Sequence, residues 1–351
     1  MKPSSAIAPR AAAPLCSWSR ALLGLAAGLC AVAGVVLYLG ISRRDLGAHL
    51  HELRTGPLLF AAAGALVLLS LQALRWWLVM RPALGLQYFH AHCAMAVGFL
   101  FNVLLPARGG DLLRVQYLGR RTGRSRAKIF GTAIIDFWTD KLGWVVSFPL
   151  VCLLGNPPAW LLKPALLLGS LVVGVGALLA ILASRIGQFG GVSRGPQWLR
   201  NLREGFAAIH WKRLLGIELL VAPLPWLWET LVLMVAAHTF GMRFTAMQAF
   251  SLLTAFNVAT VVPSPGNTGS FEAGGALALI AFGMPRGTAL TFVFLYHLTQ
   301  VVPTVTLGAL VLISQGEKLF GRDGLAGSPC REATTDLETP TDPSLSGGST
   351  C

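Results

Sequence analysis

The chain has 351 residues and a net charge of +13, with 54% hydrophobic and only 12% charged residues and a mean hydropathy of +0.64. A soluble globular domain carries about 25% charged residues, so this composition excludes one and predicts an integral membrane protein. The sequence has no basic platform interleaved with aromatic residues, so the positive charge indicates cytoplasmic loops beside anionic lipid rather than a nucleic-acid partner.

The N-terminal part predicts two membrane spans. Residues 1–20 are polar and basic and residues 21–41 are continuously apolar, which predicts a cytoplasmic N-terminus followed by a first span. Residues 57–80 form the second span. Near its end stands Arg75-Trp76-Trp77, a combination typical of a membrane interface.

Residues 88–118 predict a re-entrant hairpin. The apolar stretch 90–106 is shorter than the roughly 20 residues that a crossing needs. The most basic loop of the chain follows, from Arg108 to Lys128, and the positive-inside rule places it in the cytoplasm. The segment must therefore enter and leave by the same face, and we expect its turn at residues 106–110.

The remaining chain alternates apolar stretches with basic loops. We expect spans at 129–154, 161–184, 214–240 (kinked by Pro223 and Pro225) and 289–314. A basic cytoplasmic loop, with an interfacial helix at 197–213, lies between the second and third of these. Residues 246–282 predict a hairpin that enters from outside.

The predicted fold is an all-α polytopic membrane protein with six full spans and two re-entrant helical hairpins in an inverted pseudo-repeat. The transmembrane domain covers residues 21–314. The tail, 315–351, is rich in Gly, Ser, Pro and Thr and predicts a disordered cytoplasmic segment. The expected location is the inner (plasma) membrane, with both termini in the cytoplasm.

Two similar motifs mark the hairpin turns. The first runs from Phe101 to Arg114 and the second from Phe256 to Glu272; both begin Phe-Asn-Val and continue through aliphatic residues to proline, glycines and a carboxylate. Two broken apolar segments at corresponding places point to a transporter's binding site.

The first motif predicts an anion site. A helix that starts after Gly109-Gly110 aims its N-terminus and Arg108 at one point, which suits a phosphate. The alternative is an ordinary loop at the cytoplasmic surface. The candidate site residues here are Asn102, Arg108, Asp111 and Arg114.

The second motif contributes Asn257, Asn267 and Glu272. Its Pro-Ser-Pro-Gly-Asn-Thr-Gly turn is rich in exposed backbone groups, and Glu272 suits the positive end of the following helix. The alternative is a capping acid on an exposed turn.

Isolated ionisable residues in the spans add further candidates. Asp136 and Asp140 lie one turn apart on one helix face, and we expect Lys141 to be turned away from Asp140. The two carboxylates are either a functional pair inside the span or a helix-end pair in the headgroup region. Glu229 and His297 could each pair with a hairpin arginine, act in a proton relay or have a structural partner.

No sequence motif indicates a metal site, a cofactor site or a catalytic centre. His90 and His92 lie about 200° apart on a helix, which makes them poor joint ligands, and the six cysteines show no close pairing. The tryptophans, among them Trp226 and Trp228, are expected to anchor the interface.

With these motifs the chain resembles the lysylphosphatidylglycerol synthase transmembrane (flippase-like) family, over roughly residues 20–315. The resemblance rests on Leu74-Arg75-Trp76, on Phe101-Asn102 through to Arg114, and on Pro263-Ser264-Pro265-Gly266 with Gly269 and Phe271-Glu272. The family usually has Glu at the position of Asp111, a Glu-Arg pair at Asp136-Phe137, and an arginine near His297, so its charge network differs here.

The resemblance implies a protein that moves a charged or glycosylated lipid between leaflets. Its best-known members carry a soluble aminoacyl-tRNA-dependent transferase, and no such domain is expected after residue 315. The alternative function is a membrane subunit that presents lipid to a separate lipid-modifying enzyme, or is itself a transferase. The expected partners are membrane lipids with an anionic or phosphate-bearing headgroup.

Overall fold

A computed structural model describes residues 55–105, 108–186, 211–262 and 264–314. The predicted N-terminal segment, first span and C-terminal tail lie outside these residues, as do most of the predicted interfacial helix 197–213 and the prolines Pro106 and Pro263. Throughout the described ranges the regular structure is helical, as predicted.

The helices in chain order are α3 (Thr55–Leu84), α4 (Tyr88–Leu104), α5 (Gly110–Thr122), α6 (Arg126–Cys152), α7 (Ala159–Ile186), α9 (Trp211–Val221), α10 (Pro223–Ala237), the 3₁₀ turn η3 (His238–Phe240), α11 (Ala246–Ala259), the 3₁₀ turn η4 (Pro265–Asn267), α12 (Ser270–Ala281) and α13 (Arg286–Ser314).

Four stretches of the described chain are long and apolar enough to cross a membrane: Thr55–Leu84, Ala159–Leu178, Leu214–Phe240 and Arg286–Ser314. Their side chains stay largely outside the protein core; in α7, for example, Leu166 and Leu167 are 75% and 72% exposed. Such a surface needs an apolar solvent, because a soluble monomer rarely exposes large contiguous apolar patches. α6 has the length of the predicted span 129–154, but its charged residues separate it from this apolar set.

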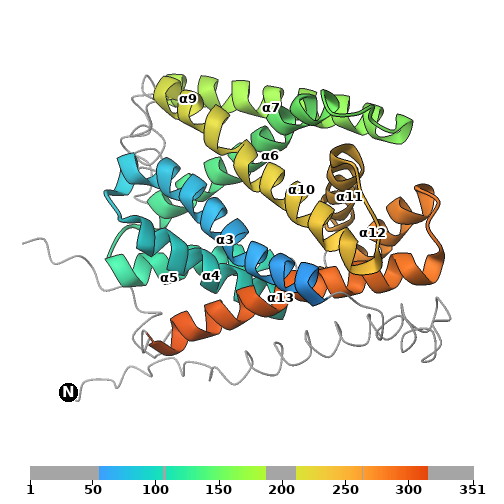
Figure 1. Ribbon diagram of the computed structural model, residues 1–351. Helices are drawn as coiled ribbons and strands as arrows, with labels where there is room; N and C mark the ends of the chain where they lie inside the picture. Colours follow the sequence, from blue (N-terminus) through green and yellow to red (C-terminus); the bar gives the residue numbers. More distant parts are fainter. Residues whose placement is uncertain (1–54, 106–107, 187–210, 263, 315–351) are drawn as a thin grey trace, which may run out of the picture. The chain divides into compact units, whose positions relative to one another are not determined.

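Both predicted interruptions are present. α4 and α11 are short apolar helices of 17 and 14 residues, each ending inside its Phe-Asn-Val motif. After the break the chain continues as α5 and α12, and α4 packs on α5 as α11 packs on α12. Figure 1 shows the α4–α5 pair and the α11–α12 pair in different parts of the helix bundle, and α13 packs on both pairs.

Backbone chemistry sets several helix ends. Gly123 ends α5 in the left-handed conformation that glycine adopts without a steric penalty. Thr245 and Gln248 form a capping box at the start of α11. The predicted kink in 214–240 is a break at Ala222, before Pro223, and Gly143 of α6 packs directly against the Ala222 carbonyl.

The largest buried cluster joins α10, α11, α12 and α13 with the end of α6. Rings dominate it: Trp144 stacks on Phe148 at 5.3 Å, and Phe256 stacks on Phe271 at 3.9 Å and on Tyr296 at 5.9 Å. Aromatic pairs of this kind add about 0.5–1.5 kcal/mol each beyond their buried area. The cluster packs α11 and α12 against α13.

Candidate functional site

Arg75 is the centre of a buried ion-pair network. Its Nε lies 3.0 Å from Asp136 Oδ1 and its Nη1 lies 2.6 Å from Asp140 Oδ1. The two carboxylates share one face of α6, as predicted. Arg75 is only 4% exposed, so it lies inside the protein and not on its outer surface.

Arg114 extends the network from α5. Its Nη1 lies 3.2 Å from Asp136 Oδ2, and its Nε lies 3.5 Å from Asp111 Oδ1. The guanidinium also stands over the Trp76 ring, 4.5 Å from the centroid, where a cation–π contact adds attraction. Asp136 therefore joins α3, α5 and α6 through two arginines.

Lys141 completes the network, which corrects a prediction. Its Nζ lies 2.8 Å from Asp140 Oδ2 and 5.6 Å from the centre of the Trp226 ring. The residue does not turn away from Asp140, because the flexible lysine stem bends back to the neighbouring carboxylate. The network thus balances Arg75, Arg114 and Lys141 against Asp111, Asp136 and Asp140.

The tryptophans that were expected to anchor a membrane interface form hydrogen bonds inside the protein. Trp76 is fully buried and donates to Thr132 Oγ1 at 3.2 Å, and Trp226 donates to the Asp140 carbonyl at 3.0 Å. Trp228 donates to the Gly64 carbonyl at 2.9 Å. These hydrogen bonds join α3, α6 and α10 around the network.

The break of the first motif brings Arg108 to the site. α5 starts at Gly110, whose lack of a side chain lets it pack against Gly98 and Asn102 of α4. Arg108 stands before this start with φ +55° and an exposed side chain. Among the residues that the structure describes, none forms an ion pair with Arg108.

The second motif places Glu272 in the first turn of α12, as predicted. One carboxylate oxygen accepts the Gly269 N–H at 2.6 Å and the other lies 2.6 Å from His297 Nδ1. Glu272 is thus a capping acid, but it is only 3% exposed rather than on an exposed turn. Phe271 stacks on the His297 ring at 4.4 Å, so the pair ties α12 to α13.

The two motifs meet each other. Gly266 of η4 lies in the left-handed region, and a side chain added there would contact Val103 at the end of α4. The neighbouring Asn267 is also left-handed, with φ +57°, a conformation that asparagine tolerates better than most residues. The second break therefore sits directly beside the first.

Two cavities adjoin these breaks, with volumes of about 180 and 140 Å³. Arg108, Asn102, Asn257 and Glu229 line both of them. The larger also reaches Asn267 and His297, whereas the smaller reaches the ion-pair network. Arg108 and Asn257 further line a third, mostly apolar space of about 360 Å³ between α6, α7 and α11.

The sequence-predicted site residues fall into three groups. Asn102, Arg108 and Asn257 lie where the cavities meet; Asn267 and His297 line the larger one; Asp111, Arg114, Asp136 and Asp140 line the smaller one. Glu272 lines neither, but it holds His297.

Sequence reasoning missed Arg75, Lys141, Gln72 and Gln300 as site residues. Arg75 carried a usable signal, since a charge within an otherwise apolar span is by default a functional candidate.

The family model of the lysylphosphatidylglycerol synthase TM region matches residues 22–308. The chain belongs to this family. The match covers every helix described above except the last turns of α13, and it makes the chain a membrane domain of the lysylphosphatidylglycerol synthase TM family. No curated protein and no solved structure matches the chain.

Proposed function

We propose that this member of the lysylphosphatidylglycerol synthase TM family binds a lipid with a charged or glycosylated, phosphate-bearing headgroup and moves it between leaflets. The observation that carries the proposal is Arg108. It is a cation without an ion-pair partner in the described chain, placed where three cavities and both broken helix pairs meet. A guanidinium in that position suits a phosphodiester.

The neighbouring charges support this role for Arg108. Arg75, Arg114 and Lys141 are already neutralised by carboxylates, so they offer an incoming phosphate little net attraction. In this proposal the network holds α3, α5 and α6 in place, while Arg108 takes the headgroup. The mostly apolar space beside Arg108, bounded by Leu168 and Val258 among others, suits acyl chains.

The proposed membrane arrangement follows from charge. The junction of α5 and α6 carries Arg120 and Arg121 in the last turn of α5, Arg124 in the loop and Arg126 at the start of α6. By the positive-inside rule this junction belongs in the cytoplasm. The α4–α5 pair then enters from the cytoplasm and the α11–α12 pair from outside, and both termini are cytoplasmic. Half-helices that meet near the midplane are a common architecture for a transport site.

A second candidate function is supported by the family itself, which is named after the membrane region of a synthase. In this version the protein holds the lipid in the same cavities and presents it to a separate lipid-modifying enzyme. It predicts that lipid binds but does not cross the membrane.

The test uses purified protein in proteoliposomes with fluorescently labelled phosphatidylglycerol and a reducing agent that quenches only the outer leaflet. Arg108→Ala is expected to lower the rate of lipid movement at least tenfold, because a hydrogen bond to a charged group contributes about 1.5–3 kcal/mol. Arg108→Lys keeps the charge and should retain part of the rate.

The matched control is Arg243→Ala, which removes an exposed arginine that lines none of the three cavities. It should leave the rate unchanged. Equal rates for Arg108→Ala and wild type would remove Arg108 from the mechanism. No lipid movement by the wild type, with lipid still bound, would favour the presenting subunit.

A further inference from the structure

The cavity of about 180 Å³ beside the two breaks is lined by carboxamides from five different elements. Gln72 of α3, Asn102 of α4, Asn257 of α11, Asn267 of η4 and Gln300 of α13 all face it. We call these five residues the amide chamber. They come from both broken helix pairs and from two long helices, so the chamber exists only in the assembled fold.

Several hydrogen-bonding atoms of the amide chamber have no partner among the described residues. Asn102 Oδ1 and Gln300 Nε2 are fully buried and unpaired within the described structure. Asn257 donates through Nδ2 to the Leu253 carbonyl at 3.0 Å, which leaves its own carbonyl oxygen for another group. A buried polar group without a partner is costly, so these atoms are available to a ligand.

The chemistry of the unpaired atoms selects the ligand. A carboxamide offers an acceptor and two donors without net charge, and a hydroxyl likewise both donates and accepts. Phe99, Phe256 and Phe271 line the same cavity and supply apolar faces for carbon-bound hydrogens. These groups fit a ring or chain with several hydroxyls better than they fit a compact ammonium ion.

Arg108 lines the same cavity as the amide chamber. We propose that the chamber binds an uncharged, polyhydroxylated headgroup of the glycerol, inositol or sugar class, with its phosphodiester on Arg108. This inference rests on the proposed function for the identity of the cavity as a lipid site, but it concerns which headgroup binds and through which residues.

Glu229 offers the competing possibility. It lines the same cavity and accepts one hydrogen bond, from the Tyr296 hydroxyl at 3.4 Å. Arg108 and Glu229 together could therefore hold a zwitterionic headgroup, with phosphate on the arginine and ammonium on the carboxylate. The two headgroup classes differ in whether the carboxamides or Glu229 determine the preference.

The experiment measures binding to the full chain in detergent by isothermal titration calorimetry. The soluble probes are myo-inositol 1-phosphate, glycerol 1-phosphate, O-phosphoethanolamine and inorganic phosphate. A second arm uses mixed micelles of phosphatidylinositol or phosphatidylethanolamine, which distinguishes a lipid headgroup from a free phosphate ester. We expect the inositol and glycerol probes to bind at least tenfold more tightly than inorganic phosphate or phosphoethanolamine.

The variants assign that preference to residues. Gln300→Leu and Asn257→Leu should each weaken binding of myo-inositol 1-phosphate about five- to tenfold, the effect of one lost hydrogen bond. Their affinity for inorganic phosphate should stay, which also shows that the site is folded. Gln116→Leu, a carboxamide of α5 outside the three cavities, is the control, and Glu229→Gln should keep the polyol preference.

Equal affinity for phosphate and the polyol phosphates, or tighter binding of phosphoethanolamine that Glu229→Gln abolishes, would overturn the inference. Binding of myo-inositol 1-phosphate alone, without phosphatidylinositol binding in micelles, would overturn the lipid source. Lipid movement at equal rates for all headgroups would leave the proposed function standing while the amide chamber fails. Polyol preference without lipid movement would support the amide chamber and refute the proposed movement of lipid.

Discussion

Replacement of Arg75 by Met tests the buried network most sharply. Arg75 neutralises Asp136 and Asp140 at once, at 3.0 and 2.6 Å. Removing one partner of a buried ion pair costs about 3–5 kcal/mol, because the other charge is left uncompensated. Asp136 keeps Arg114 and Asp140 keeps Lys141, so we expect a loss near the lower end, about 3 kcal/mol.

The assay is reversible unfolding in mixed micelles, followed by tryptophan fluorescence. Arg81→Met is the matched control, since Arg81 lies on the same helix, is exposed and stands over the Trp77 ring, 5.0 Å from its centroid. It should change the free energy of unfolding by less than about 0.5 kcal/mol. The double variant Arg75→Met/Asp136→Leu should recover part of the loss, because both charges of that pair are gone.

The reasoning would be refuted if Arg75→Met cost no more than Arg81→Met. It would also be refuted if the losses of Arg75→Met and Asp136→Leu simply added in the double variant, since contacting residues should couple by about 0.5–3 kcal/mol.

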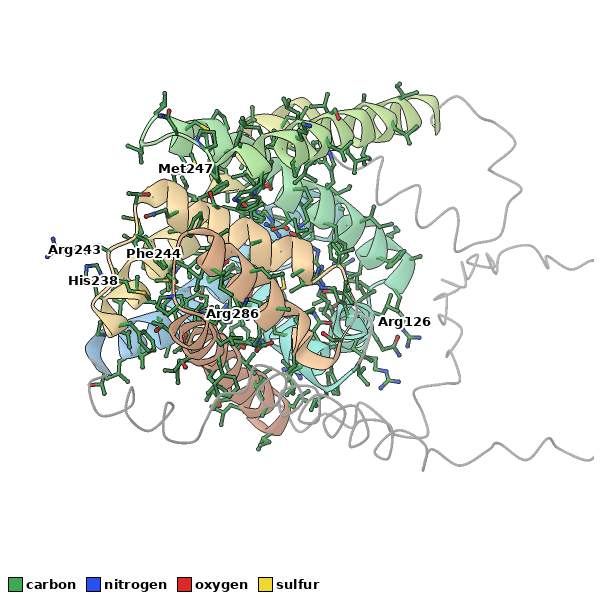
Figure 2. All side chains as sticks on the ribbon, turned by 90° about the vertical axis from the view of Figure 1, so that its right-hand side faces the viewer. Arg126, His238, Arg243, Phe244, Met247 and Arg286 are labelled. Carbon is green, nitrogen blue, oxygen red and sulfur yellow. The ribbon has the colours of Figure 1, made fainter. Side chains whose placement is uncertain are left out.

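Three further predictions concern other parts of the chain. Glu218 of α9 is fully buried, and neither carboxylate oxygen has a hydrogen-bond partner among the described residues. Glu218→Met should therefore raise the thermal midpoint in detergent, and a fall would contradict this reading. Arg126 and Arg243 lie on opposite sides in Figure 2. In a background without native cysteines, an impermeant maleimide should label Arg243→Cys on intact cells and Arg126→Cys only after permeabilisation. Labelling of both variants on intact cells would refute the proposed topology. Glu272→Gln should lower the free energy of unfolding by about 1–3 kcal/mol, because it weakens the hydrogen bond to His297 that joins α12 to α13. An unchanged free energy of unfolding would show that this pair does not stabilise the fold.

The breaks in the helices were predictable because their causes are local. Proline and glycine weaken a helix interior, and both motifs concentrate them, so α4 and α11 end inside their motifs as the sequence indicates. The shared face of Asp136 and Asp140 follows equally from the helical repeat. Glu272 at the start of α12 follows from its position after Gly269.

The partners of these residues were not predictable in the same way. Arg75 beside two tryptophans has the composition of an interface anchor, and only the packing of α3 on α6, between residues 61 and 65 positions apart, shows its role. Lys141 depended on a side-chain conformation that helix geometry alone does not fix. Gln72 and Gln300 are neutral and isolated in sequence, so only the fold shows that they share a cavity with the asparagines of the motifs.

The central claim is that a lipid headgroup passes between the two helix breaks. A side chain added at Gly266 would lie 3.4 Å from Val103 Cγ1, so we expect cysteines at the two positions to form a disulfide. In a background without native cysteines, we predict that oxidised Val103→Cys/Gly266→Cys protein moves no labelled lipid in proteoliposomes and regains its rate on reduction. Full lipid movement while the disulfide is shown to be closed would contradict the account.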